Sequence, residues 1–361
     1  MTPLVVVGVP GDRRTRLFAE AAARCGLGPP EVVAWRQVLT SGPPPLPDGA
    51  LVRLESPGED AEVDALLRGP GAPTRVGGGA RWHEHFVRAL HRVREAVAAT
   101  PGARLAGDVG EIAVMFDKRR CHALLEAAGV PVPPALPGFT DSPPGGAYER
   151  LRARMAEAGW PRVFVKPAHG SSASGVVALN ADGERVRAVT SAAFEDDGLH
   201  NSLRVRTYGR EPDVARLVAA LAPDGLHVER WFPKASLGGR VIDLRVVVIG
   251  GTPTHAVVRA ALGPITNLHL GAARGDLDGL RDRLGARRWA AALDVCAQAA
   301  ACFPASPMTA VDLMVGTDLN RFAVAEVNAF GDLLPGLTGL PGTAEGLDTY
   351  TAQLHHLKAV L

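Results

Sequence analysis

The chain has 361 residues, of which 47% are hydrophobic, and 39 basic against 38 acidic residues leave a net charge of +1. This length favours two or three domains with a globular core. The balanced charge argues against bulk attraction to nucleic acid or membranes, and we expect neither as a partner. Four cysteines without a C-x-x-C pair, no signal peptide and no membrane-spanning apolar run indicate a cytoplasmic protein.

The first part of the chain has the pattern of a small α/β domain. Residues 4–9 form a short apolar run typical of a buried parallel strand, residues 14–25 have helical spacing, and residues 31–35 form a second apolar run. A further strand at residues 51–54 and a long helix at residues 82–99 follow. We assign residues 1–112 to this domain.

A helix that begins at Asp117 and Lys118 opens the next part of the chain, and Gly129 ends it. The apolar strand 163–166 then ends in Lys166, and a loop of small residues, 170–175, follows before the next strand. Small side chains allow backbone N–H groups to approach an anion closely, and the lysine adds a charge. This pattern favours a phosphate site, although a plain flexible hairpin is the alternative.

Two carboxylates and an amide lie on the last pair of predicted strands. Asp312 is on the first strand, and Glu326 and Asn328 are two residues apart on the second, so they point to one face. Apolar neighbours make both strands look internal, and an internal carboxylate needs a partner or a metal. Oxygen ligands of this kind suit Mg²⁺. Ordinary carboxylates at a turn are the alternative.

A third group of charges lies on the preceding strands. Asp243 and Arg245 are on an apolar strand, and Arg259 is on the next one. Burying an arginine costs free energy unless the guanidinium meets an anion. Arg245 and Arg259 are therefore suited to bind a phosphoryl group. A structural Asp–Arg salt bridge is the alternative.

Taken in order, these motifs resemble the ATP-grasp superfamily, and within it the glutathione synthetase-like and ribosomal protein S6 glutamate ligase-like enzymes. The resemblance covers residues 111–361 and includes Lys-Pro-x-His-Gly-Ser from Lys166, Glu229 to Phe232, and Glu-Val-Asn from Glu326. It implies an α/β and α+β architecture in which two α+β lobes clasp ATP behind a small α/β pre-ATP-grasp domain. We expect the first lobe at residues 113–228 and the second at residues 229–361.

The resemblance also implies roles for individual residues. Arg245 and Arg259 would be catalytic, Asn267 and Gly271 would contact substrate, and Asp312, Glu326 and Asn328 would hold Mg²⁺. The expected ATP-binding residues are Lys118, Lys166, His169, Gly170, Ser171, Ser172, Ala173, Glu229, Arg230, Trp231 and Phe232. Many relatives carry a ribose-binding acid after the hinge, whereas this chain has Pro233 and Lys234 there.

The implied activity is an Mg-ATP-dependent ligation of a carboxylate to an amine, or to a thiol, through an acyl phosphate with release of ADP and phosphate. The carboxylate belongs to a small molecule or a peptide, and we expect residues 191–210 to supply one of the acceptor loops. A phosphotransferase without ligation and a non-catalytic nucleotide-binding partner protein are the alternatives. The substrates, the number of metal ions and the oligomeric state stay open.

Overall fold

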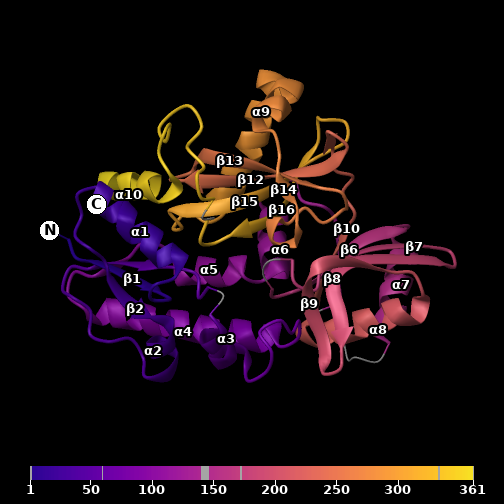
Figure 1. Ribbon diagram of the computed structural model, residues 1–361, viewed down its shortest axis with the longest axis horizontal. Coiled ribbons are helices and arrows are strands. Elements are labelled where there is room, and N and C mark those ends of the chain that lie inside the picture. The colour runs from indigo at the N-terminus through magenta and orange to yellow at the C-terminus, as the bar shows by residue number, and fades with distance from the viewer. Residues whose placement is uncertain (1, 59, 140–145, 171–172, 332–333, 361) are drawn as a thin grey trace.

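The computed structural model describes residues 2–58, 60–139, 146–170, 173–331 and 334–360. Its strands form sheets in three regions, which we call the N-terminal domain, the middle lobe and the C-terminal lobe (Figure 1). None of the helices in these described ranges has the length and apolarity that crossing a membrane requires.

The N-terminal domain contains a parallel sheet in the order β2-β1-β3-β4. Its strand β1 (Leu4–Gly8) carries Val5, Val6 and Val7, which are almost completely buried because helices pack against both faces. The expected strand–helix–strand start is confirmed. The other elements are α1 (Arg13–Arg24), β2 (Glu31–Ala34), α2 (Trp35–Thr40), β3 (Leu51–Leu54), α3 (Ala61–Arg68), α4 (Gly79–Ala99), β4 (Arg104–Leu105) and α5 (Val109–Met115).

The middle lobe contains a sheet in the order β5-β10-β6-β7-β8-β9, and α7 and α8 pack on one of its faces. In strand β6, Val163 and Val165 face these helices, whereas Phe164 and Lys166 alternate to the opposite face. The elements are β5 (Ala135–Leu136), α7 (Ala147–Glu157), β6 (Arg162–Pro167), β7 (Val177–Asp182), β8 (Arg185–Glu195), β9 (Gly198–Tyr208), α8 (Glu211–Leu221), η1 (Ala222–Asp224) and β10 (Leu226–Arg230).

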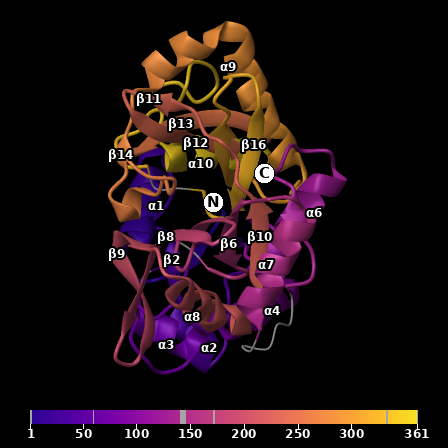
Figure 2. The same ribbon diagram turned by 90° about the vertical axis from the view of Figure 1, so that its right-hand side faces the viewer.

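The C-terminal lobe contains a sheet in the order β14-β13-β12-β15-β16, and α9 covers its outer face, as Figure 2 shows. Within α9, Gly285 has a φ of 71°, so the helix kinks there. The elements are α6 (Lys118–Ala127), β11 (Ser236–Leu237), β12 (Arg240–Ile249), β13 (Thr252–Ala261), η2 (Leu268–Leu270), β14 (Ala273–Arg274), α9 (Leu277–Ala301), β15 (Met308–Val315), β16 (Phe322–Asn328) and α10 (Thr349–Val360).

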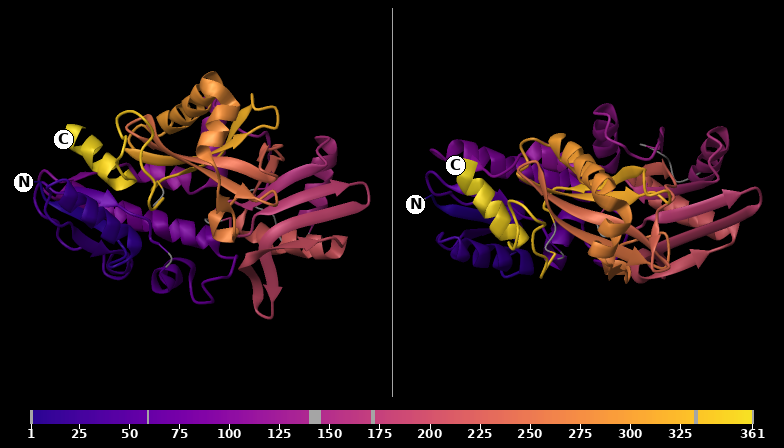
Figure 3. Two further views of the ribbon diagram at one scale, coloured as in Figure 1. Left: turned by 45° about the horizontal axis from the view of Figure 1, so that its top comes forward. Right: turned by 90° about the horizontal axis from the view of Figure 1, so that it is seen from above.

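Two helices join parts of the chain that are distant in sequence. Helix α6 precedes the middle lobe, yet Cys121 and Leu125 on its buried face belong to the core of the C-terminal lobe. Helix α10 packs against α1 of the N-terminal domain, so the first and last helices lie side by side at one end of the molecule (Figures 1 and 3). The structure therefore leaves the boundaries at residues 112 and 228 as predictions.

One expectation about local structure is wrong. Residues 191–210 were expected to be an acceptor loop, but most of them belong to the long antiparallel strands β8 and β9. Much of β9 is exposed, and Leu203 is 77% exposed, so the segment lacks the apolar alternation of a half-buried strand. Its strand structure depends on pairing with β8.

Candidate active site

Lys118 connects the middle lobe to the C-terminal lobe. It is the first residue of α6, and its Nζ donates to the Gly170 carbonyl oxygen at 2.6 Å and lies 2.9 Å from Glu326 Oε1. Its backbone N–H donates to the Ala168 carbonyl oxygen at 3.0 Å. One lysine thus contacts both the small-residue loop 170–175 and strand β16.

Asp117 fixes the start of α6 and holds His169. Its Oδ1 accepts from the Arg119 backbone N–H at 3.0 Å, and its Oδ2 lies 3.3 Å from His169 Nε2. Burial alone raises the pKa of Asp117, but the nearby His169 ring and the Arg119 guanidinium outweigh burial and hold that pKa well below its usual range. The His169 ring also stacks on His83 of α4, with 4.2 Å between ring centroids. His169 therefore ties the loop to the N-terminal domain.

Lys166 forms a buried ion pair within the middle lobe. Its Nζ lies 2.5 Å from Glu229 Oε1 and 3.5 Å from the Ala325 carbonyl oxygen of β16. Burial raises the pKa of Glu229, but the Lys166 ammonium and His227 overcome this and lower the pKa to about 2. Glu229 is therefore ionised at neutral pH, and Lys166 reaches strand β16 of the C-terminal lobe.

The expected metal ligands lie on one face of two paired strands. Asp312 of β15 is opposite Glu326 of β16, and Asn328 is opposite Ala310. The Asn328 Nδ2 donates to the Ala310 carbonyl oxygen at 3.2 Å, which orients its amide. Asp312 is only 6% exposed, so its charge needs partners. The three side chains offer only oxygen ligands for a hard cation.

Both expected catalytic arginines contact Asp312. Arg245 hydrogen-bonds to this carboxylate through Nε, and Arg259 Nη2 lies 3.1 Å from Asp312 Oδ2. Arg259 Nε also donates to Asp243 Oδ1 at 2.7 Å. Burial raises the pKa of Asp312, but the two guanidinium groups outweigh it and lower the pKa. The alternative of Asp–Arg salt bridges is therefore present in the structure, and these bridges include Asp312, one of the expected metal ligands.

Sequence reasoning missed a buried cation next to these arginines. Lys234 Nζ donates to Thr266 Oγ1 at 2.6 Å and lies 3.6 Å from Asp243 Oδ2. Burial lowers the pKa of the Lys234 ammonium, and Asp243 opposes that effect. The available signal was its position, because Lys234 follows the hinge where a ribose-binding acid was expected. No sequence pattern pointed to His83.

The small-residue loop is described only at its ends. His169 and Gly170 begin it and Ala173 follows, whereas Ser171 and Ser172 lie outside the described residues. Ala173 has a φ of 57°, and its carbonyl oxygen accepts from Ser191 Oγ at 3.0 Å. The loop is thus anchored on strand β8 at its second half.

The expected hinge begins inside a strand. Glu229 and Arg230 end β10, and Trp231 and Phe232 follow it. The Trp231 ring lies against Phe164 of β6, with 4.9 Å between ring centroids. The chain therefore leaves the middle lobe while the Trp231 ring packs against the sheet of that lobe.

The expected substrate contacts lie on a loop that packs against the small-residue loop. Asn267 Oδ1 accepts from the His269 backbone N–H at 2.8 Å, and Gly271 has a φ of 83°, so both shape the short helix η2. Ile265 and Leu270 of the same loop pack against Val176, next to loop 170–175. This packing brings the segment next to loop 170–175, and its contact with substrate stays a prediction.

No family model matches the chain, and no curated protein matches it either. Solved structures do match over nearly the whole length. D-cycloserine synthetase DcsG has a TM-score of 0.57 and 18% identity, with 99% of each chain covered. The ATP-grasp ligase PsnB complexed with a minimal precursor has a TM-score of 0.54 and 19% identity, covering 100% of this chain and 99% of that one.

The macrocyclase MdnC, bound with the precursor peptide MdnA from Microcystis aeruginosa MRC, is similar with a TM-score of 0.54 and 14% identity over 100% of both chains. Likeness at these identities shows architecture, while function depends on the site. The chain has the ATP-grasp fold, and the fold class predicted from the sequence is confirmed.

Proposed function

We propose that this chain is an Mg-ATP-dependent ligase that joins a carboxylate to an amine and releases ADP and phosphate. The 2.9 Å contact between Lys118 Nζ and Glu326 Oε1 carries the proposal. It sets a cation suited to phosphate beside a carboxylate suited to a metal, and the same lysine also contacts Gly170 of the middle lobe. Mg²⁺ in nucleotide sites is held by one or two carboxylates together with phosphate oxygens, so this spacing suits a metal-bound triphosphate.

The nucleotide would lie between the two lysines and the hinge. Lys118 and Lys166 would contact phosphate oxygens together with backbone N–H groups of loop 170–175. The adenine would pack along residues 229–232, with their backbone groups recognising its edge. Lys166 is held by the buried Glu229 at 2.5 Å, which directs the ammonium before a phosphate arrives.

The residues on β15 and β16 fit a magnesium ion. Asp312, Glu326 and Asn328 offer two carboxylates and one amide oxygen on neighbouring strands, a set that a hard cation prefers. A bound Mg²⁺ supplies neutralisation of the negative charge on the phosphate oxygens.

The proposed reaction has two steps. A substrate carboxylate oxygen attacks the γ-phosphorus, and the bond between that phosphorus and the oxygen bridging it to the β-phosphate breaks. ADP is the leaving group, and the substrate becomes an acyl phosphate. The amine nitrogen then attacks the acyl carbon, loses a proton, and expels phosphate as the amide forms. Arg245 and Arg259 would stabilise the charge that builds up on the transferring oxygens, so no covalent protein nucleophile is required.

The solved structures with this fold bear on the substrate class. One is named D-cycloserine synthetase, and two others are described in complex with a minimal precursor and with a precursor peptide. They support either a small-molecule or a peptide carboxylate, with an amine as acceptor. Arg274, whose Nη2 donates to the Pro335 carbonyl oxygen at 3.0 Å, lies on β14, directly after the segment that carries Asn267 and Gly271.

The test is incubation with ATP, Mg²⁺ and pools of amino acids and peptides. We expect equal amounts of ADP and phosphate and a new amide in the mass spectrum, all lost in Glu326→Ala. Release of AMP would overturn the acyl phosphate route. A phosphorylated product without an amide would instead identify a phosphotransferase. Normal ATP affinity without turnover on any pool would favour a non-catalytic nucleotide-binding protein.

A further inference from the structure

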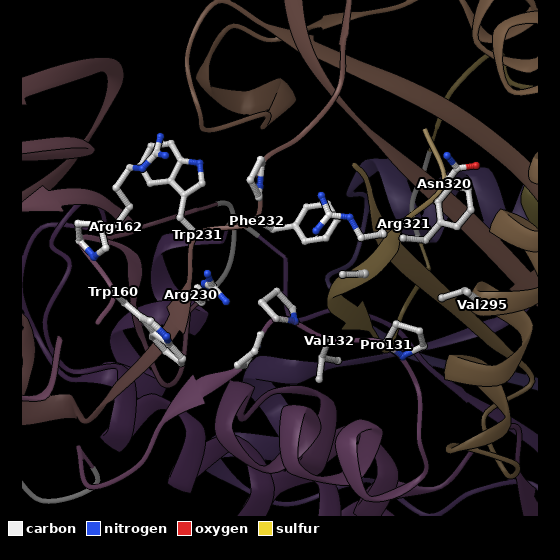
Figure 4. A pocket seen from close by; sticks show the side chains of 16 residues that line it. Pro131, Val132, Trp160, Arg162, Arg230, Trp231, Phe232, Val295, Asn320 and Arg321 are labelled. Carbon is white, nitrogen blue, oxygen red and sulfur yellow. The ribbon is translucent and has the colours of Figure 1, made fainter. Parts of the chain in front are cut away.

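The N-terminal domain meets the proposed nucleotide site at its phosphate end. The hinge residues proposed for the adenine end, among them Trp231 and Phe232, line a cavity of about 680 Å³ (Figure 4). The lining that the described residues form contains none from the N-terminal domain. Helix α4 of that domain instead meets the start of loop 170–175, where His83 stacks on His169. The N-terminal domain can therefore act on the phosphate-binding loop.

The start of helix α4 is fixed on the middle lobe. Its N-cap residue is Gly78, which has no side chain to satisfy the free N–H groups at the start of the helix. Asp224 of η1 takes this role: its Oδ2 accepts from the Gly78 N–H at 2.7 Å, and its Oδ1 accepts from the Ala80 N–H at 3.2 Å. Helical side chains lean toward the N-terminus of their helix. His83, about one turn after Ala80, therefore leans toward this contact with the middle lobe.

Two contacts fix the ring of His83. Its Nε2 lies 3.0 Å from the Ala113 carbonyl oxygen of α5, and Nε2 carries the proton because a carbonyl oxygen can only accept. The face of the ring stacks on His169, with 4.2 Å between ring centroids and 21° between ring planes. Helix α5 thus holds the edge of the ring, and the loop covers its face.

The ring of His169 depends on this stacking for its orientation. It is buried, and in the described part of the chain neither of its nitrogens makes a well-aligned hydrogen bond, although Nε2 lies 3.3 Å from Asp117 Oδ2. Gly170 comes next, and its carbonyl oxygen accepts from Lys118 Nζ at 2.6 Å. A displaced His169 ring would therefore disturb the contact between the loop and the lysine proposed to bind phosphate.

We propose that His83 is a positioning residue for the nucleotide: its ring, stacked on His169, holds loop 170–175 against Lys118 before ATP binds. The inference rests on the proposed function, because the loop position matters to catalysis only if ATP binds there. Groups that are already in place cost less to order on binding, so loss of the stack weakens ATP. His83 touches no reacting atom in this proposal, and its loss therefore raises KM for ATP rather than lowering kcat at saturating ATP.

Amide hydrogen exchange of the full chain without nucleotide tests whether His83 holds the loop. We expect exchange in the segment that contains His169 and Gly170 to become about ten-fold faster in His83→Ala. His83→Phe keeps a flat ring and should retain wild-type exchange. His83→Asn keeps a donor for the Ala113 carbonyl oxygen but has no ring, so it should behave as His83→Ala does. Wild-type exchange in His83→Ala, or equal rescue by the Asn and Phe variants, would overturn the proposal.

Calorimetric titration with Mg-ATP and initial rates test the consequence for binding. His83→Ala should weaken ATP and raise its KM about ten-fold, with kcat changed less than about two-fold, and His83→Phe should restore the affinity. His85→Ala is the matched control, because His85 is on the same helix but its Nδ1 lies 3.4 Å from the Leu66 carbonyl oxygen of α3. Weaker ATP binding with unchanged exchange in the loop, or a lower kcat with unchanged KM, would contradict a positioning role.

The two experiments separate this inference from the proposed function. Equal ATP affinity in the wild type and in His83→Ala would refute the inference and leave the proposed function standing. A wild-type chain that binds no ATP would refute the proposed function, while the exchange experiment still decides whether His83 holds the loop. If His83→Ala does not fold, the comparison of His83→Asn with His83→Phe takes its place.

Discussion

Asn328 is the expected metal ligand that carries no charge, so its replacement tests metal binding with little change in electrostatics. We predict that Asn328→Ala lowers turnover about 100-fold and raises the Mg²⁺ concentration needed for half-maximal rate, because one oxygen ligand is lost. Initial rates measured across Mg²⁺ concentrations check this. Asn320→Ala, at an exposed position, is the control. Wild-type turnover in Asn328→Ala would contradict the assignment of Asn328 as a metal ligand.

Lys166 has two expected roles, a phosphate contact and the ion pair with Glu229, and a single substitution removes both. Lys166→Ala removes a phosphate contact, and it also leaves Glu229, which is 3% exposed, without its ammonium partner. An uncompensated buried carboxylate costs about 3–5 kcal/mol. We therefore predict both weaker ATP binding and a lower free energy of unfolding, measured by titration with ATP and by urea denaturation.

The double variant Lys166→Met with Glu229→Gln separates these roles. It removes both charges at once, so most of the lost stability should return while ATP affinity stays low. If Lys166→Ala binds ATP as tightly as the wild type, the phosphate role of this lysine is wrong.

At the scale of elements, helix α4 begins against the small-residue loop. A Cβ on Gly79 would lie 2.6 Å from the His169 carbonyl oxygen. Helix propensity favours alanine over glycine by up to about 1 kcal/mol, but the contact forces the loop or the helix to move. We predict that Gly79→Ala lowers the melting temperature and weakens ATP binding. Gly209→Ala, where a Cβ meets no atom within 4 Å, is the control and should do neither.

Helix α10 closes the core of the N-terminal domain through Tyr350. This side chain is 2% exposed, packs edge-on against Phe18, and donates from its hydroxyl to Glu55 Oε2 at 3.1 Å. We predict that Tyr350→Ala destabilises the protein by about 3–5 kcal/mol through the cavity it leaves. Tyr350→Phe keeps the ring and should cost only about 2 kcal/mol. Equal losses in urea denaturation would contradict a packing role.

The sequence predicted elements where burial and chain pattern agree. Strands β6, β15 and β16 were found because apolar residues flank their charged ones, and the start of α6 was found from Asp117. Strand β9 was missed since Leu203 and its neighbours are exposed, and pairing with β8 rather than a core face makes it a strand. Helix α6 was placed correctly, yet its packing on the C-terminal lobe is a tertiary contact that the local sequence pattern does not predict.

The residues of the candidate site likewise divide into those that the sequence predicted and those that it did not. Lys166, Asp312 and Glu326 were identified because charged residues on apolar strands need a reason to be there. Lys234 and His83 were missed, because the burial of one and the stacking of the other depend on segments far away in the sequence. Local signals thus predicted individual elements and the resemblance implied the fold, while contacts between segments far apart in the sequence could not be predicted.

At the scale of the whole molecule, the histidines predict a stability that depends on pH. Burial lowers the pKa of His83, His227 and His255 below the ordinary value of about 6.5. The unfolded chain therefore takes up protons below pH 6.5 that the folded protein does not, and acidification favours unfolding. We predict that the free energy of unfolding falls between pH 7 and pH 5, measured by urea denaturation.

The histidine at position 255 offers a way to check the origin of this slope. His255→Gln should flatten the decline, because one of the groups that bind extra protons in the unfolded chain is gone. Glu229, with a pKa lowered to about 2, acts in a separate window below about pH 4.5. A free energy of unfolding that rises on acidification from pH 7 to pH 5 would contradict the assignment.

The packing of α10 on α1 has a consequence for biosynthesis. A chain made from its N-terminus forms strands β1 to β4 long before residues 349–360 leave the ribosome. Until then Phe18 and Glu55 lack Tyr350, their partner in the finished protein. The N-terminal domain therefore keeps part of its apolar surface uncovered until residues 349–360 have been translated. The N-terminal domain of a nascent chain is therefore exposed to chaperones and proteases until residues 349–360 emerge and complete it.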